Sequence, residues 1–173
     1  MCVYAHVDAS CGVHVDGKSH TGIAISLGHS YIYVHFGKQK LVSCSFTEAD
    51  LFGLSEGAGI TIWSRDYVLN QGYVIGPTIG YQDNLSIMAM AEKGRSTSKK
   101  TRHINARYFF IKDRIETGDT VFQYLAAKDM IADVLTKPLP GKQFRRLRGL
   151  LLNCADVSQS DSAYEEYVEK GDF

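Results

Sequence analysis

The sequence predicts an α/β domain built on one five-stranded mixed sheet with helices packed against it. The chain has 173 residues, 45% of them hydrophobic and 11% aromatic, which is enough for one domain with a substantial core. The first 40 residues contain β-forming segments separated by short turns. Later segments carry apolar residues at helical spacing and alternate with further strands, a pattern typical of a sheet covered by helices.

The predicted strands are rich in Val, Ile, Tyr and Phe, which favour extended backbone. Turns at Asp16-Gly17 and at 28–30 separate the first three strands, which therefore form a meander. The predicted strands cover residues 3–8, 21–27, 31–36, 77–82 and 120–125.

Five wholly or partly helical segments are predicted between and after the strands. In the first, apolar residues recur at helical spacing after Thr47, the expected N-cap. Glycines at positions 53, 57 and 59 each cost about 0.5–1 kcal/mol relative to Ala, so this helix depends on packing. The predicted helices cover residues 48–69, 84–93, 99–116, 129–137 and 143–153.

The formal net charge of zero hides an asymmetry along the chain. Residues 1–153 contain 18 Lys and Arg against 13 Asp and Glu, whereas residues 154–173 contain one Lys against six acidic residues. We therefore expect a basic domain over 1–153 and an acidic, flexible tail over 154–173. The sequence has no apolar run of membrane-spanning length, no signal-peptide pattern and no CxxC pair, so we expect an intracellular protein with reduced cysteines.

Acidic side chains at the ends of predicted elements are candidates for a metal site. Asp8 ends the first predicted strand and Asp83 the fourth, so the two lie side by side if these strands are neighbours. Glu48 or Asp50 opens the first long helix, and Asp133 lies in the fourth. Each could instead be a turn, cap or surface residue. Clustered carboxylates repel unless cations lie between them, and two Mg²⁺ ions are the usual solution in phosphodiester hydrolysis.

An ordered set of motifs runs from residue 3 to residue 153. The matching stretches are VDAS (7–10), HTGIAISLG (20–28), GKQKLVSCSFTEADLFGLSE (37–56), YQDN (81–84), RHINARYFFIKDRI (102–115) and KDMIADVLTKPLPGKQFRRL (128–147). The most specific parts are ADVLTKPL and TRHINARYFF. This set resembles the ribonuclease H domain of copia-type LTR-retrotransposon polyproteins.

The resemblance implies a ribonuclease H-like fold, with helices on both faces of the sheet, and endonucleolytic hydrolysis of the RNA strand of RNA–DNA hybrids. It also implies a reverse transcriptase domain before this one, which the sequence does not contain, and no membrane partner. The residues that it implies as catalytic, and as ligands of two Mg²⁺ ions with Mn²⁺ as an alternative, are Asp8, Asp50, Asp83 and Asp133.

One ligand position departs from the resembled family, which usually has Glu where this chain has Asp50. Asp is one methylene shorter than Glu, and the coordination geometry of Mg²⁺ is strict. Glu48 is an alternative ligand, but positions 48 and 50 point about 200° apart on a helix and cannot both face one site. The second functional hypothesis is therefore a catalytically impaired retrotransposon remnant that at most binds nucleic acid.

Residues 93–114 form a candidate nucleic-acid interface, with eight Lys and Arg against Asp113 alone. Such a segment can bind phosphates whatever the base sequence, although it can equally be an ordinary solvated face with aromatic residues in the core. The candidate contacts are Lys93, Arg95, Lys99, Lys100, Arg102, His103 and Arg107.

The run Arg145-Arg146-Leu147-Arg148 matches the RxLR pattern of some secreted effectors. Arginine is frequent in this amphipathic segment and no signal-peptide pattern precedes it, so we interpret the match as incidental. A secreted effector is the third and least favoured hypothesis.

Overall fold

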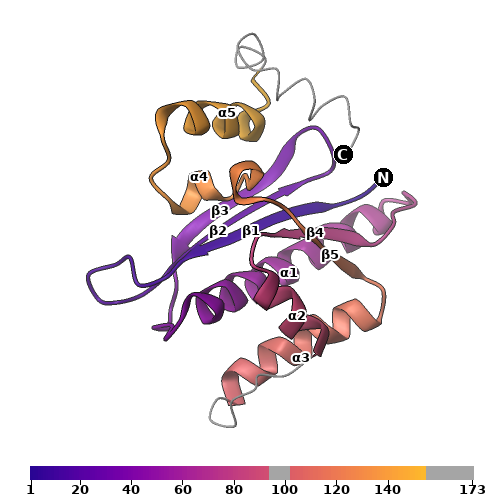
Figure 1. Cartoon of the computed structure of the whole chain (residues 1–173). Helices are drawn as coiled ribbons and strands as arrows, with labels where there is room; N and C mark the ends of the chain where they lie inside the picture. The colour runs from indigo at the N-terminus through magenta and orange to yellow at the C-terminus, as the bar shows by residue number, and fades with distance from the viewer. Residues whose placement is uncertain (94–101, 155–173) are drawn as a thin grey trace.

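The computed structural model of the protein describes residues 1–93 and 102–154 (Figure 1). Its centre is a five-stranded sheet in the order β3-β2-β1-β4-β5. β2 is antiparallel to β1 and β3, whereas β4 is parallel to β1 and β5. The predicted mixed sheet is confirmed, and the first and fourth strands are neighbours, which is the condition under which Asp8 and Asp83 were expected to lie side by side. The strands are β1 (Tyr4–Ser10), β2 (His20–Ser26), β3 (Tyr31–Lys38), β4 (Thr78–Gln82) and β5 (Thr120–Tyr124).

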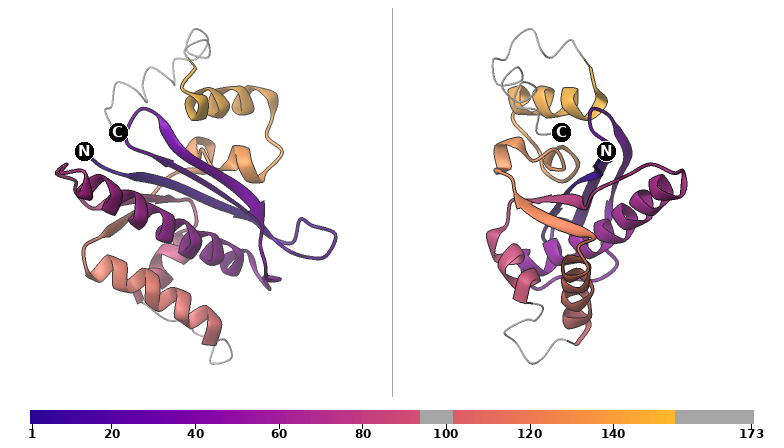
Figure 2. Two further views of the ribbon diagram at one scale, coloured as in Figure 1. Left: turned by 180° about the vertical axis from the view of Figure 1, so that it is seen from behind. Right: turned by 90° about the vertical axis from the view of Figure 1, so that its right-hand side faces the viewer.

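Helices cover both faces of the sheet, as opposite views of the ribbon show (Figures 1 and 2). The first three helices pack on one face, and the last two on the other. No helix in the described part of the chain has the length and apolar character needed to cross a membrane. The elements are α1 (Phe46–Asn70), α2 (Leu85–Lys93), α3 (Arg102–Glu116), the 3-10 turn η1 (Ala127–Asp129), α4 (Asp133–Thr136) and α5 (Gly141–Leu152).

Each face of the sheet has its own hydrophobic core, because successive side chains of a strand point to opposite faces. Val7 of β1 and Ile23 of β2 point toward α1, whereas Ala24 of β2 points toward α4 and α5. The first core also contains Leu51, Leu54, Ile87 and Ile111, and the second contains Ile131, Leu147 and Leu150.

The helix predicted over 129–137 is wrong in its first half. The chain forms η1, then an irregular segment, and only then the single turn α4. Met130, Ile131 and Ala132 are consecutive and all buried. A surface helix buries one side and exposes the other, so three successive buried residues favour an irregular segment here.

α1 begins two residues earlier than predicted, and its N-cap is Ser45 rather than Thr47. The Ser45 hydroxyl accepts a hydrogen bond from the Glu48 backbone N–H at 3.1 Å. The Glu48 carboxylate in turn accepts one from the Cys44 N–H at 2.7 Å. This reciprocal pattern is close to a capping box, which satisfies backbone donors at the start of a helix.

Two of the three glycines in α1 allow the helix to lie close to the sheet. A Cβ on Gly57 would lie 2.8 Å from Val7 Cγ2, and one on Gly53 would lie 3.1 Å from Thr21 Cγ2. Gly59 is exposed, and a Cβ there would have no heavy atom within 4 Å. The cost of glycine in a helix is therefore offset by packing at positions 53 and 57 but not at 59.

Gly59→Ala and Gly57→Ala should change stability in opposite directions. We expect Gly59→Ala to raise the free energy of unfolding by about 0.5–1 kcal/mol, because it removes only the helix penalty. Gly57→Ala should lower it by about 1–3 kcal/mol, because Val7 must move. Urea denaturation of both variants checks this, and an equal gain in both would show that α1 does not need the close approach.

Candidate metal centre

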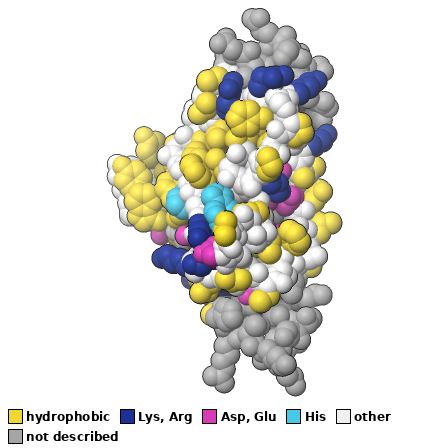
Figure 3. All heavy atoms as spheres, turned by 90° about the vertical axis from the view of Figure 1, so that its left-hand side faces the viewer, with side chains coloured by type: hydrophobic (Ala, Val, Ile, Leu, Met, Phe, Trp, Pro, Cys, Tyr) yellow, Lys and Arg dark blue, Asp and Glu magenta, His cyan; other side chains and the backbone are white. Residues whose placement is uncertain are grey.

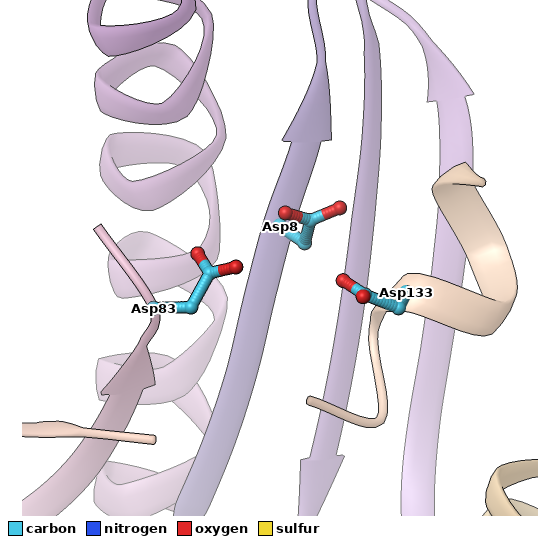
Figure 4. Close-up of side chains that lie close together, drawn as sticks. All are labelled: Asp8, Asp83 and Asp133. Carbon is cyan, nitrogen blue, oxygen red and sulfur yellow. The ribbon is translucent and has the colours of Figure 1, made fainter. Parts of the chain in front are cut away.

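Three aspartates from three separate elements meet at one end of the β1–β4 pair (Figure 4). Asp8 lies within β1, Asp83 directly follows β4, and Asp133 is the first residue of α4. Each offers one carboxylate oxygen, and these oxygens all lie within 4.8 Å of one another. Asp8 and Asp133 are buried and Asp83 is half-buried.

The sheet positions the first two of these aspartates. β1 extends two residues beyond its predicted end, so Asp8 lies inside the strand, opposite Gly22 of β2. β4 runs parallel to β1, and its carboxyl end therefore places Asp83 beside Asp8.

Gly22 allows α4 to bring in the third aspartate. A Cβ at Gly22 would lie 2.8 Å from both Leu135 Cβ and Thr136 Cγ2. Only a residue without a side chain leaves room for α4 this close to the sheet. Glycine opposite Asp8 is therefore a structural requirement of the site.

Thr136 and Lys137, at the end of α4, bind the same carboxylates. The Thr136 hydroxyl donates a hydrogen bond to Asp8, and the Ser10 hydroxyl donates one to the Thr136 carbonyl at 2.6 Å. The Lys137 ammonium lies 3.2 Å from Asp8 Oδ1 and 2.9 Å from Asp133 Oδ1. Neither role was predicted from the sequence. The spacing of Asp133 and Lys137, four residues apart on a helix, was nevertheless a usable signal for an ion pair.

Asp50 borders the same cleft but is not one of the three converging carboxylates. It is buried in α1, and its Oδ2 accepts a hydrogen bond from Asn84 Nδ2 at 2.9 Å. Asp8, Asp50, Asp83 and Lys137 all line this cleft, whose volume is about 580 Å³. Asn84, the last residue of the YQDN motif, thus holds Asp50 beside the three converging aspartates.

The structure does not bring Glu48 to the carboxylates. Its side chain caps α1 through the Cys44 N–H and lines a separate small pocket with Arg107. The proposed alternative ligand therefore has a structural role at the start of the helix.

Burial and repulsion from neighbouring carboxylates raise the pKa values of Asp50, Asp83 and Asp133. Burial, with smaller contributions from Asp8 and Asp83, raises the pKa of Asp50 to about 6. Burial and Asp8 raise the pKa of Asp133 to about 6 although Lys137 opposes the shift, and burial raises the pKa of Asp83. Burial alone would lower the pKa of Lys137, but Asp8 and Asp133 raise it overall.

The donor set fits a hard divalent cation. Carboxylate oxygens are the ligands that Mg²⁺ and Mn²⁺ prefer, and Asp8, Asp83 and Asp133 each offer one within 4.8 Å of the other two. A cation would also supply the positive charge that closely spaced carboxylates require.

The predicted nucleic-acid interface falls largely outside the described residues. Arg95, Lys99 and Lys100 lie in the segment between the described ranges, and the side chains of Lys93, Arg102 and His103 are not among those described. Arg107 packs against α1: its guanidinium lies 4.0 Å from the centre of the Phe52 ring and donates to Ser55 Oγ at 2.7 Å. Over the described residues of the face in Figure 3, Lys and Arg side chains form separate groups among hydrophobic ones.

Two residues of the Arg145–Arg148 run have structural roles. Arg146 donates to Asp129 Oδ1 at 2.6 Å and to the Lys128 carbonyl at 3.0 Å, which ties α5 to η1. Leu147 is fully buried in the second core. Packing of α5 thus accounts for both residues without reference to an effector motif.

Comparison with known proteins finds similarity to one segment of retrotransposon polyproteins. It is 25% identical over 147 residues to the Pol polyprotein of transposon TNT 1-94 from Nicotiana tabacum, covering 84% of this chain and 11% of the relative. It is 28% identical to the Pol polyprotein of transposon RE1 from Arabidopsis thaliana, covering 84% of this chain and 10% of that relative. The Gag-Pol polyprotein of transposon Ty1-JR1 from Saccharomyces cerevisiae is 27% identical, and the match covers 81% of this chain and 8% of that relative. The chain thus spans about a tenth of the length of the curated relatives it matches, and no protein-family model matches it.

Solved structures with the same fold are ribonuclease H domains. LC11-RNase H1, solved in complex with RNA/DNA hybrid, superimposes with a TM-score of 0.54 at 12% identity, covering 77% of this chain and 92% of that one. The N-terminal RNase H domain of a Mycobacterium tuberculosis protein superimposes with a TM-score of 0.53 at 13% identity, covering 84% of this chain and 95% of that one. The predicted fold is therefore confirmed. The chain is similar in sequence to one segment of these retrotransposon Pol polyproteins, and it has a ribonuclease H-like fold.

Proposed function

We propose that this chain is a retrotransposon-type ribonuclease H domain that hydrolyses the RNA strand of RNA–DNA hybrids in a metal-dependent reaction. The observation that carries the proposal is the convergence of Asp8, Asp83 and Asp133 at one end of the central strands in this fold. Two further findings support the choice of substrate: the relatives are Pol polyproteins, and LC11-RNase H1 was solved with an RNA/DNA hybrid.

In this proposal Asp8, Asp83 and Asp133 hold two divalent cations, Mg²⁺ or Mn²⁺. When bound, the cations activate the attacking water and stabilise the leaving oxygen of the phosphodiester. The chain supplies position: β1 and Thr136 fix Asp8, and α4 fixes Asp133. Exposed Phe46 and Leu85 line the same cleft and offer apolar surface to the sugar rings of a nucleic acid, independent of base sequence.

Asp50 favours the second candidate function, a catalytically impaired remnant that at most binds nucleic acid. Its carboxylate stays bound to Asn84 instead of joining the three converging acids. A Glu at this position would carry the carboxylate one methylene further into the cleft. The two functions therefore differ in whether three carboxylates suffice for the reaction or a fourth is required.

Asp8→Asn should abolish hybrid cleavage. We expect a loss of more than about 100-fold in Mg²⁺ or Mn²⁺, because even outer-sphere partners of a metal typically contribute about 10–100-fold. The readout is the cleavage of a labelled RNA–DNA hybrid, with duplex DNA as a substrate control. Asp66→Asn, at an exposed position on α1, is the matched control and should cleave like the original chain. Equal activity of Asp8→Asn and Asp66→Asn would disprove the assignment.

Asp50→Glu tests which candidate function is correct. If the short side chain limits metal binding, Asp50→Glu should raise cleavage and Mg²⁺ affinity together by about tenfold. Cleavage assays and calorimetric Mg²⁺ titrations of the two proteins provide the comparison. Activity in the original chain with no gain in Asp50→Glu would show that three aspartates suffice, whereas activity that arises only in Asp50→Glu would identify an impaired remnant with an intact fold.

Asp50 should also make stability depend on pH. Its pKa is higher in the folded chain than its ordinary 3.8, so its ionisation destabilises the fold as the pH rises from 3.8 through about 6. Asp50→Asn stays neutral and can still accept from Asn84. It should raise the free energy of unfolding by about 1–3 kcal/mol at pH 7.5 and by much less at pH 4. Urea denaturation in EDTA at both pH values measures the free energy of unfolding. An equal increase for Asp50→Asn at pH 7.5 and at pH 4 would contradict the prediction.

A further inference from the structure

The Lys137 ammonium lies between two carboxylates assigned to the metal centre. It is 3.2 Å from Asp8 Oδ1 and 2.9 Å from Asp133 Oδ1. The two carboxylate side chains are 3% and 5% exposed, whereas the Lys137 side chain is 36% exposed. A partly exposed cation therefore reaches inward to a pair of buried anions that would otherwise repel each other.

The backbone at Lys137 is fixed, but its side chain can move. The Lys137 N–H donates to the Asp133 carbonyl at 3.0 Å, and the preceding carbonyl, of Thr136, accepts from Ser10. Pro138 follows directly and restricts the backbone further. The ammonium itself is carried on a flexible four-carbon stem. Lys137 can therefore leave the carboxylates without disruption of α4 or the sheet.

We propose that Lys137 is a positioning residue that serves as an internal counterion for Asp8 and Asp133 and competes with divalent cations for their oxygens. The proposal rests on the proposed function, because it takes these acids as the metal ligands. Asp8 Oδ1 accepts from Lys137 while Asp8 Oδ2 accepts from Thr136, so both oxygens of this carboxylate are engaged. Cation binding at Asp8 is then an exchange, and the apparent affinity falls with the fraction of molecules in which Lys137 holds the site.

The same contacts should stabilise the fold when no divalent cation is bound. Removal of one partner from an ion pair with a buried carboxylate leaves an uncompensated charge. Loss of the ammonium should therefore weaken the fold in EDTA and strengthen cation binding. A residue with only a packing role would not produce these opposite effects.

The test compares Lys137→Met, which keeps the length of the side chain without its charge, with Lys137→Arg, which keeps the charge. Lys128→Met is the control, because Lys128 is an exposed lysine in η1, nine residues before Lys137. Each protein is titrated with Mg²⁺ and with Mn²⁺ by calorimetry, and its thermal midpoint is measured in EDTA and in saturating Mg²⁺. We expect Lys137→Met to bind Mg²⁺ about tenfold more tightly and to melt several degrees lower in EDTA. Lys137→Arg should stay near the original chain, and Lys128→Met should match it.

Equal or weaker Mg²⁺ affinity in Lys137→Met, with binding retained in the original chain, would overturn the competition and leave the proposed function intact. Absence of Mg²⁺ and Mn²⁺ binding in every protein would overturn the proposed function, and the competition with it. Should Lys137→Met not fold in EDTA, Lys137→Gln keeps a hydrogen-bond donor toward the carboxylates and provides the same affinity comparison.

Discussion

Repulsion between like charges is the constraint on which the rest of this structure depends. Three carboxylates approach within 4.8 Å, and two of them are buried. Such an arrangement needs positive charge or bound protons. The chain supplies positive charge through Lys137, which lies against Asp8 and Asp133, and burial raises the pKa of Asp133 to about 6, so that this carboxyl takes up a proton more readily than a free one. The same repulsion that costs the fold stability is what a divalent cation would relieve, so the proposed metal binding and the cost of clustering the acids have one origin.

Much of the fold could be predicted because its signals are local. A mixed sheet covered by helices could be predicted from three local signals: the β-rich start, the helical spacing of apolar residues after residue 47, and the change of period between them. The adjacency of β1 and β4 was only a condition of the predicted site, because no local pattern fixes which strands pair. The single turn α4 could not be predicted from residue spacing, because the burial of Ile131 before it depends on packing with β2 and α5 that no local pattern contains. The N-cap was misplaced by two residues because Ser45 and Thr47 are equally good candidates from sequence alone.

The acids of the site were named from the motifs, but their partners were not. Asp8, Asp83 and Asp133 do converge. Asn84 and Thr136 lie within the same motifs, yet their contacts with Asp50 and Asp8 depend on how α1 and α4 meet the sheet. The role of Gly22 had no distinctive signal in the sequence. A glycine inside a strand indicates only a weakened strand until the packing of the neighbouring helix is known. What sequence reasoning lacked was the packing of the two helices, not the identity of the acids.

The sequence separation of the site residues has a consequence for protein synthesis. Lys137 and Asp8 are 129 residues apart, and both ends of this interval must be in place before the centre exists. On a ribosome, the β1–β3 meander can pair early from contacts within the first 40 residues, and α1 can then cover one face. The opposite face stays open until α4 has left the ribosome. A growing chain therefore lacks the complete aspartate cluster, and it acquires the cluster only when the segment that contains α4 packs onto β1 and β2.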